Sequence, residues 1–325
     1  MRNEITFISK LNLSRFTNFC CIVLNYVWLK LFKREICISI PFSLTIEPTN
    51  ACNLKCPQCL TGLSKYKDQG YMSLEFFKRL IDTYSKKVMM VQLHFRGEPM
   101  LHKDLFEMIS YAASRNMYLT LSTNGHFISE NVEQILNSGL NHINISLDGM
   151  SEEVYTQYRK GGNFNKVIEG IKKLAAGKMK KMTENFLLIT LQMLITRHTE
   201  QEKKRFRTLR KIPGIDACKL KSMQVVDQKT AHLYKPGEKK YQRASRNTRR
   251  KICLKTLTTA VFSWDGKLLP CCYDRHEKFI LNEIAAIPDM RKMGELMKSF
   301  RASLYHNHMP AMCNNCEESA DRIYF

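Results

Sequence analysis

The sequence predicts an α/β fold built from repeated strand–helix units around a parallel sheet, followed by a small cysteine-rich domain. Two patterns carry this prediction. From residue 42 onward, short apolar runs alternate with segments of helical periodicity. After residue 250 the chain becomes a short region punctuated by cysteines. With 325 residues, of which 44% are hydrophobic, the chain can form one large domain with a real core and a small second one.

The first 41 residues are expected to form an apolar, amphipathic helical segment. Its apolar run covers residues 16–32, contains Trp28, and is bounded by Arg15 and by Lys33 and Arg34. A membrane span needs about 20 apolar residues, whereas a helix with flanking cations and an aromatic residue can lie in the membrane interface. Three interpretations therefore stay open: a helix packed on the core, an interfacial membrane helix and a membrane span.

Six strand–helix units can be traced between residues 42 and 225. The expected strands cover residues 42–46, 91–95, 118–122, 143–147, 186–195 and 219–225. The expected helices have apolar residues at helical spacing over 74–84, 105–112, 132–136, 164–174 and 200–210. Ser73 is expected to cap the first of these helices, and Gly177 to end the fourth.

A basic linker over residues 226–252 is expected to separate the strand–helix units from the cysteine-rich region, residues 253–325. Eight cations between Lys235 and Lys251 face only Glu238 there, which is typical of a solvated linker. The net charge of +21 indicates an anionic partner, such as membrane lipid, nucleic acid or an acidic peptide, without choosing among them.

A C-x3-C-x2-C motif, Cys52, Cys56 and Cys59, follows the first expected strand. Iron–sulfur clusters are usually held by four thiolates, so three local ones suggest a [4Fe-4S] cluster with one iron open to a small molecule. Zinc, with a fourth ligand from elsewhere in the chain, is the alternative. The first apolar run has no signal-peptide cleavage site, so we expect a reducing compartment, where cysteine clusters are metal ligands more often than disulfides. The cysteines outside such clusters are expected to be small buried apolar residues: Cys20, Cys21, Cys37 and Cys218.

This motif and its flanks resemble those of the radical SAM superfamily. The residue before the third cysteine is often aromatic in that superfamily, and here it is Gln58. The resemblance implies a partial (β/α)6 TIM-like barrel over residues 42–225 and S-adenosylmethionine (SAM) bound at the open iron. It also implies reductive cleavage of SAM to a 5'-deoxyadenosyl radical, with electrons from a donor such as a flavodoxin or ferredoxin.

Further SAM contacts follow from the same resemblance. Arg96-Gly-Glu-Pro99 is similar to the Gly-Gly-Glu-Pro motif of the superfamily, with an arginine in place of the first glycine, and implies that Glu98 accepts hydrogen bonds from the SAM amino group. Asn124 and Ser146, after the next two strands, would contact the ribose or carboxylate. Arg159 would pair with the SAM carboxylate as a charge-assisted fork. Taken singly, such residues are also typical of turns and solvated helices.

The C-terminal cysteines form a second set, Cys253, Cys271, Cys313 and Cys316. The spacing C-x12-G-x4-C between the first two resembles the opening of SPASM-type auxiliary-cluster domains, although the cysteines of a second auxiliary cluster are missing. The resemblance implies one auxiliary [4Fe-4S] cluster, with Cys272 as an alternative ligand to Cys271. Structural zinc is the alternative, because two separated cysteine pairs also bind zinc.

We therefore predict a radical SAM enzyme that abstracts hydrogen from a peptide or protein, located in the cytoplasm or at the membrane periphery. The apolar N-terminal segment keeps a lipid substrate open, and the basic linker keeps RNA open. A different class also stays open, namely a zinc-bearing nucleic-acid-binding or scaffold protein without radical chemistry.

Overall fold

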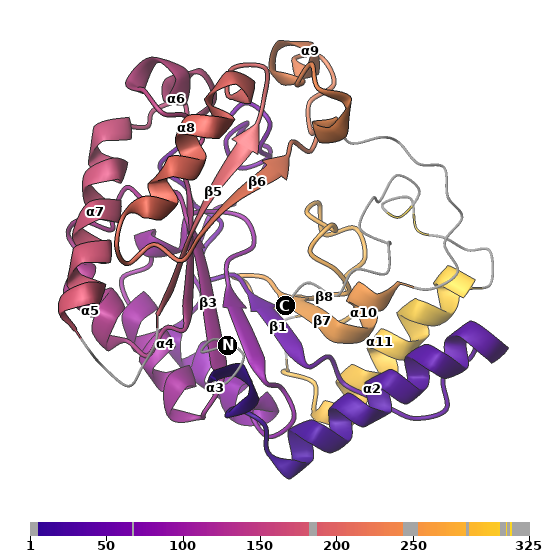
Figure 1. Cartoon of the computed structure of the whole chain (residues 1–325). Helices are drawn as coiled ribbons and strands as arrows, with labels where there is room; N and C mark the ends of the chain where they lie inside the picture. Colours follow the sequence, from indigo (N-terminus) through magenta and orange to yellow (C-terminus); the bar gives the residue numbers. More distant parts are fainter. Residues whose placement is uncertain are drawn as a thin grey trace.

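The computed structural model describes residues 6–66, 68–181, 187–242, 253–283, 286–305, 310 and 313. Within these residues one eight-stranded sheet has the order β6-β5-β4-β3-β2-β1-β7-β8 (Figure 1). It is parallel except for the antiparallel pair β7 and β8. The strands are β1 (Ser43–Ile46), β2 (Met90–Leu93), β3 (Tyr118–Thr123), β4 (His142–Ser146), β5 (Leu188–Ile195), β6 (Ala217–Ser222), β7 (Thr259–Phe262) and β8 (Leu268–Leu269). The predicted α/β class with a parallel-dominated sheet is confirmed.

Helices connect the strands and cover the outside of the curved sheet (Figure 1). In chain order these are α3 (Leu74–Tyr84), η1 (Pro99–Leu101), α4 (Leu105–Ser114), α5 (Val132–Asn137), α6 (Glu152–Tyr158), α7 (Phe164–Lys180), η2 (Glu200–Glu202), α8 (Lys203–Thr208) and η3 (Leu209–Lys211). The other helices are α2 (Leu13–Phe32), α9 (Ala231–Tyr234), η4 (Lys239–Tyr241), α10 (Leu254–Thr258) and α11 (Met290–Tyr305). In Figure 1, α2 and α11 lie along the same end of the molecule, next to α10.

The outer face of the sheet forms the main hydrophobic core. Alternate strand residues such as Leu44, Val91 and Ile143 point toward the helices and are fully buried with Phe77 of α3. Because side chains alternate between the two faces of a strand, the intervening residues must line the inner face of the curved sheet. The sheet therefore has its main apolar core on one side, and its inner side is available for other chemistry.

Helix ends show where local signals succeed and fail. Ser73 caps α3 as predicted, since its hydroxyl accepts a hydrogen bond from the Phe76 amide. The prediction that Gly177 ends the next long helix is wrong, because α7 continues to Lys180. A Cβ at Gly177 would lie 2.9 Å from Leu136 Cδ1 of α5. The glycine thus permits close packing of two helices rather than a helix end.

The segment expected as one helix over 200–210 is instead divided into η2, α8 and η3. The last barrel strand, β6, begins at Ala217, two residues before its expected start, and ends earlier than predicted. After the linker, β7 pairs in parallel with β1 and so extends the same sheet. The expected domain boundaries stay a prediction, and residues 243–252 of the basic linker lie outside the described residues.

The N-terminal apolar segment is a helix, α2, and none of the helices in the described ranges combines the length and apolarity that a membrane crossing requires. The expectation that Cys20, Cys21, Cys37 and Cys218 are small buried residues is wrong. Each is partly exposed, and Cys21 and Cys37 form a disulfide with their Cα atoms 6.5 Å apart. The reason is that the chain turns after α2 and runs back along it, which brings these two positions together.

Candidate active site

The cysteine motif lies in the loop that follows β1, at the carboxyl edge of the parallel sheet. Its backbone is fixed within the loop and from outside, because the Cys59 amide donates to the Cys56 carbonyl (3.2 Å) and the Lys55 amide to the Lys160 carbonyl (2.9 Å). Gly62 packs directly on this loop, where a Cβ would lie 2.4 Å from the Cys56 carbonyl oxygen. The loop therefore requires glycine at position 62, a residue that the sequence patterns did not identify.

Gln58, the departure from the usual aromatic, has a clear structural role. Its side-chain oxygen accepts hydrogen bonds from the Val226 and Asp227 amides at 2.9 and 3.0 Å. Its amide nitrogen donates to the Asp227 carbonyl and the Thr230 hydroxyl at 3.0 and 2.9 Å. A buried aromatic ring could not satisfy these groups, so Gln58 joins the cysteine loop to the segment after β6 by four hydrogen bonds.

The three thiols lie close enough to influence one another electrostatically. Burial, above all, raises the pKa of Cys52 to about 12, and nearby Cys56 and Cys59 add to this shift. Burial also raises the pKa of Cys56 to about 11. A bound metal centre would reverse this, since a coordinating thiol is deprotonated outright.

Within the described ranges, no three His, Cys, Asp or Glu side chains converge on a single metal ion. Cys52, Cys56 and Cys59 pack in one small cluster with Leu54. Three thiols on one loop are the donor set that an iron–sulfur cluster with one open iron requires.

Glu98 occupies the next loop, after β2, and contacts the cysteine loop through its backbone. Its amide donates to the Ala51 carbonyl at 2.7 Å. Gly97 has φ +28°, and a Cβ there would lie 2.3 Å from the Thr49 carbonyl oxygen, so this approach requires glycine. The Glu98 carboxylate is buried, which raises its pKa, although surrounding donors oppose that shift.

Asn124 links Glu98 to the cysteine loop. The Glu98 carboxylate accepts hydrogen bonds from the Asn124 amide and the Thr123 hydroxyl, both at 2.7 Å. The Asn124 side chain in turn donates to the side-chain oxygen of Asn53, between the first two motif cysteines, at 2.8 Å. Thus two residues predicted from separate loops, Glu98 and Asn124, are in contact, and Thr123 and Asn53 join them.

Arg159, at the end of α6, reaches the cysteine loop from the other side. Its Nε donates to Asp148 Oδ2 at 2.7 Å, and its Nη1 lies 3.9 Å from Cys56 Sγ. Asp148 also accepts from the Leu194 amide of β5, so it holds the arginine in place. The nearby Asp148 and Cys56 raise the pKa of Arg159 despite its burial. Ser146 is buried at the end of β4, two residues before Asp148.

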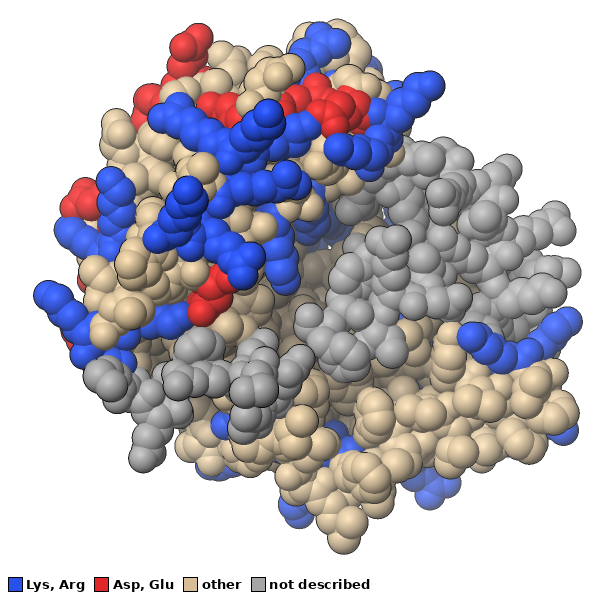
Figure 2. Space-filling view, viewed as in Figure 1, with Lys and Arg blue, Asp and Glu red and all other residues tan. Residues whose placement is uncertain are grey.

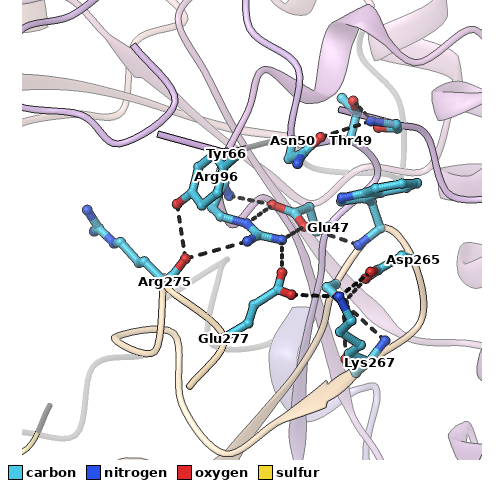
Figure 3. A network of polar contacts seen from close by, with 12 residues as sticks. Glu47, Thr49, Asn50, Tyr66, Arg96, Asp265, Lys267, Arg275 and Glu277 are labelled. Atoms are coloured by element: carbon cyan, nitrogen blue, oxygen red, sulfur yellow. Dashed lines mark hydrogen bonds and ion pairs between the residues drawn. The ribbon is translucent and has the colours of Figure 1, made fainter. Parts of the chain in front are cut away.

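Arg96 fills the position of the missing motif glycine and forms a buried ion-pair network (Figure 3). Its guanidinium pairs in bidentate fashion with Glu47, at 2.6 and 2.7 Å, and with Glu277 at 2.6 Å. It also stacks 4.7 Å from the Tyr66 ring centre, and both carboxylates raise its pKa. Glu277 also forms an ion pair with Lys267, at 2.9 Å. The motif loop is thereby joined to the C-terminal region.

The inner face of the sheet is mainly polar along the barrel strands. Strand pairing places the following polar residues on this one face: Ser43, Thr45, Gln92, Thr120, Ser122, His142, Asn144, Ser146, Thr190, Gln192, Lys219 and Lys221. The same pairing also places Met90, Tyr118, Leu188, Leu194 and Ala217 there, and all of these except Leu194 begin their strands. Asn144 donates to both Ser122 and Gln192 at 3.3 Å, and Gln92 donates to Ser43 at 3.1 Å. Beyond the first residues of the strands, the barrel interior therefore offers mainly hydrogen-bonding groups and the cations of β6.

Two histidines on this inner side are held neutral. Burial lowers the pKa of His94 and of His142 to about 4, and the cations Lys221 and Lys219, respectively, add to that effect. The His94 Nδ1 is buried without a hydrogen-bond partner in the described part of the chain. A neutral imidazole can accept a hydrogen bond from a bound molecule or donate one to it.

The second cysteine set is brought together in part. Cys253 precedes α10, and Cys271 and Cys272 follow β8. The neighbouring Cys272 thiol, together with burial and nearby Cys253, raises the pKa of Cys271 well above its usual value. Cys313 is partly exposed. Cys316 lies outside the described residues, so the four-thiolate set and the choice between Cys271 and Cys272 stay predictions.

Sequence comparison finds relatives for half of the chain. Residues 46–207 match the model of the radical SAM superfamily. This chain is 32% identical over 163 positions to a probable GTP 3',8-cyclase of Methanocaldococcus jannaschii, and the match covers 50% of this chain and 53% of that protein. They are 30% identical over 173 positions to the mycofactocin maturase MftC of Mycobacterium tuberculosis, covering 53% of this chain and 42% of that one. The chain thus spans about half the length of these curated relatives.

Solved structures share the fold over most of the chain. The structure of Streptococcus suis SuiB bound to S-adenosylmethionine has a TM-score of 0.62 at 15% identity, covering 90% of this chain and 75% of SuiB. The complex of BtrN with AdoMet and 2-DOIA has a TM-score of 0.55 at 18% identity, covering 86% of this chain and 94% of BtrN. At such identities the likeness concerns the fold alone.

Proposed function

Residues 46–207 form a radical SAM domain, and from that premise we propose that the protein reductively cleaves SAM and abstracts hydrogen from a peptide or protein. A [4Fe-4S] cluster with SAM, when bound, supplies the electron transfer and the 5'-deoxyadenosyl radical. We assign Cys52, Cys56 and Cys59 as the ligands of that cluster. The observation that carries this assignment is the meeting of three loops at these thiols, with Glu98 on one side and Arg159 on the other.

The surrounding residues are suited to orient SAM. Glu98 is a buried acceptor fixed by three protein donors, and its remaining lone pairs can accept from an amino group. Arg159 is held by Asp148 through Nε, which leaves its Nη groups directed toward the cysteine loop to pair with a carboxylate. Ser146 and Asn124 are proposed to contact the ribose or carboxylate.

Cys253, Cys271, Cys313 and Cys316 are proposed to hold one auxiliary [4Fe-4S] cluster, with Cys272 as the alternative to Cys271. The closeness of Cys253 to the adjacent pair Cys271 and Cys272 supports this proposal. The network of Arg96, Glu277 and Lys267 attaches this region to the motif loop. An electron donor such as a flavodoxin or ferredoxin is proposed as a partner, and the cytoplasm as the location, where cysteine clusters are metal ligands more often than disulfides. In that compartment the partly exposed Cys21–Cys37 pair would be reduced to thiols.

The polar inner face supports a peptide rather than a lipid as the substrate. Acyl chains on this face would leave His94 Nδ1 buried without a donor or acceptor and would remove water from the exposed cations Lys219 and Lys221, and both cost free energy. A peptide offers amide donors and acceptors to the same groups. Relatives include a mycofactocin maturase, and a solved SuiB structure is bound to the precursor peptide SuiA.

Cys56→Ala tests the catalytic proposal. Loss of one cluster ligand should reduce 5'-deoxyadenosine formation, from SAM and a strong reductant under anaerobic conditions, to background. About half of the iron should remain, because the auxiliary cluster has separate ligands. Cys218→Ala is the matched control, since this thiol lies on β6 outside both sets, and it should retain both properties. Deoxyadenosine formation by Cys56→Ala would contradict the assignment.

The substrate class is tested with the wild-type holoenzyme. A precursor peptide encoded near the gene should change mass when incubated with SAM and reductant, as mass spectrometry would show. RNA binding that weakens steeply with salt, together with a modified nucleotide and no peptide product, would favour the RNA alternative. Zinc in place of iron would overturn the enzyme proposal itself.

A further inference from the structure

The N-terminal helix α2 has its polar and apolar faces reversed relative to a helix on a soluble core. Its buried residues are Arg15, Asn18, Ile22, Asn25 and Leu29, so three of the five are polar. Ten of its residues are exposed, and all of these except Thr17 and Lys30 are large and apolar. The apolar ones have exposed fractions of 42% to 78%: Leu13, Phe16, Phe19, Val23, Leu24, Val27, Leu31 and Phe32. A contiguous apolar patch of this kind usually marks a binding surface.

The buried polar residues fix the rotation of α2. The Arg15 guanidinium donates to four backbone carbonyls, those of Lys10, Ser85, Arg115 and Asn116. Asn18 exchanges hydrogen bonds with the backbone of Ile40, at 3.0 and 3.2 Å. Turning the apolar face inward would leave these groups and the carbonyls without partners, which is costly in a buried place. The outward apolar face is therefore built into the fold.

The chain after α2 reinforces this arrangement. Asn25 accepts hydrogen bonds from the Ile36 and Cys37 amides, and its side-chain nitrogen donates to the Cys37 carbonyl at 2.9 Å, so the returning segment is held against the helix. Fully buried Arg301 pairs in bidentate fashion with Glu35 at 2.7 and 2.8 Å. The same segment exposes Ile36 and Ile38 by 49% and 43%, and Ile38 faces α11, where a Cβ at Gly294 would lie 2.6 Å from its Cγ2.

The charge around this face selects its occupant. Residues 6–34 contain no Asp or Glu, whereas Lys10, Lys30, Lys33 and Arg34 lie near the ends of the helix. Figure 2 shows the surface at the lower right, over α2, as tan with blue atoms at its edges and no red. Two copies of a chain with net charge +21 repel each other, whereas anionic lipid attracts both the chain and these cations.

We propose that the exposed apolar face of α2 forms a docking surface for a bilayer with anionic headgroups. The helix lies in the plane of the interface, its apolar face enters the boundary between headgroups and acyl chains, and its cations contact the headgroups. This surface does not depend on the proposed catalytic activity. The buried polar face stays on the protein, which makes the contact peripheral.

Vesicle flotation of the full-length holoprotein tests this proposal. The protein should float with vesicles of phosphatidylcholine and phosphatidylglycerol, bind vesicles of phosphatidylcholine alone less, and lose binding as salt is raised. Leu24→Glu should weaken partitioning by about tenfold or more, because it replaces one buried apolar side chain by a charge. Phe16→Glu combined with Leu31→Glu should weaken it further.

Met179→Glu is the matched control, because Met179 is 55% exposed on α7, as Leu24 is 54% exposed on α2. It should bind vesicles like the wild type, and circular dichroism should show that all variants remain folded. Absence of vesicle binding by the wild type would overturn the proposal. Concentration-dependent dimers that Leu24→Glu abolishes, without lipid binding, would assign the face to a second copy. Equal binding by Leu24→Glu and the wild type would also overturn it.

Discussion

The inner face of the barrel and the outer face of α2 present opposite kinds of side chain. The barrel interior is lined mainly by partly exposed polar groups, among them Gln92, His142 and Asn144, and by the exposed cations of β6. The outer face of α2 exposes large apolar side chains, while its inner face buries Arg15, Asn18 and Asn25. An exposed apolar patch is the informative exception to the general rule of burial. We propose a different partner for each face, a peptide for the first and a bilayer for the second.

The inner face of the barrel and the α2 face are stabilised in different ways. Polar groups of the interior bond mainly to one another from strand to strand, so they stay available at their edges for a ligand. The polar groups under α2 bond mainly to backbone carbonyls and amides of distant segments, so they only hold the helix. The first arrangement presents polar groups to a partner, whereas the second presents the opposite, apolar face.

The largest expected effect comes from removing the buried arginine that anchors the interior to the C-terminal region. Arg96→Gly restores the glycine of the related motif but leaves Glu47 buried and unpaired. We expect the free energy of unfolding to fall by about 3–5 kcal/mol, measured by urea denaturation. Adding Glu47→Gln to Arg96→Gly should recover part of this loss.

A surface ion pair gives the matched control for that experiment. Lys78 and Glu107 are partly exposed and 2.6 Å apart. Lys78→Ala should cost less than about 1 kcal/mol, because exposed pairs contribute little. Equal losses for Arg96→Gly and Lys78→Ala would show that the network around Arg96 does not hold the two regions together.

The next effect compares the two faces of α2. Leu29 is 2% exposed and packs into a small cluster with Ile22 and Phe42, so Leu29→Ala should lower the free energy of unfolding by about 2–4 kcal/mol. Leu24 is 54% exposed, so Leu24→Ala should change it by less than about 0.5 kcal/mol. Thermal unfolding in the absence of lipid measures both. A large loss for Leu24→Ala would mean that its side chain already packs on the protein.

The last effect appears only at acidic pH and concerns the neutral histidines of the interior. Their pKa of about 4 lies below the usual value of about 6.5 for an unfolded chain. Between these pH values the unfolded chain binds more protons than the folded chain, so the free energy of unfolding falls as the pH is lowered from about 6.5 to about 4. Above about pH 6.5 both states carry neutral histidines, and His94 and His142 cause no loss of stability. Wild type should therefore lose more stability in this window than the double variant His94→Gln, His142→Gln. Parallel stability profiles would show that the imidazoles are not buried neutral.

Local signals in the sequence predicted the frame of the molecule. Ser73 marks the start of α3, and the cysteine loop, Glu98 and Asn124 lie together because each follows a parallel strand. The carboxyl ends of parallel strands lie at the same edge of a sheet, so the positions of the strands in the sequence were enough to predict that these residues lie close together. The roles of these residues toward SAM stay proposals.

Other features depend on partners far away in the sequence. Arg96 pairs with Glu277, Arg301 with Glu35, and Gln58 with residues 226–230, and no local pattern links such positions. The Cys21–Cys37 disulfide arises because the chain runs back along α2, a turn that composition does not reveal. Gly177 was misjudged because a glycine at a helix contact looks in sequence like a glycine at a helix end.

The four hydrogen bonds of Gln58 join two loops at the carboxyl edge of the parallel sheet. They connect the loop after β1 to the loop after β6, although four strands lie between these two in the sheet. Gln58 immediately precedes Cys59. The backbone beside a cysteine of the motif is therefore positioned by residues that lie at least 168 positions later in the chain.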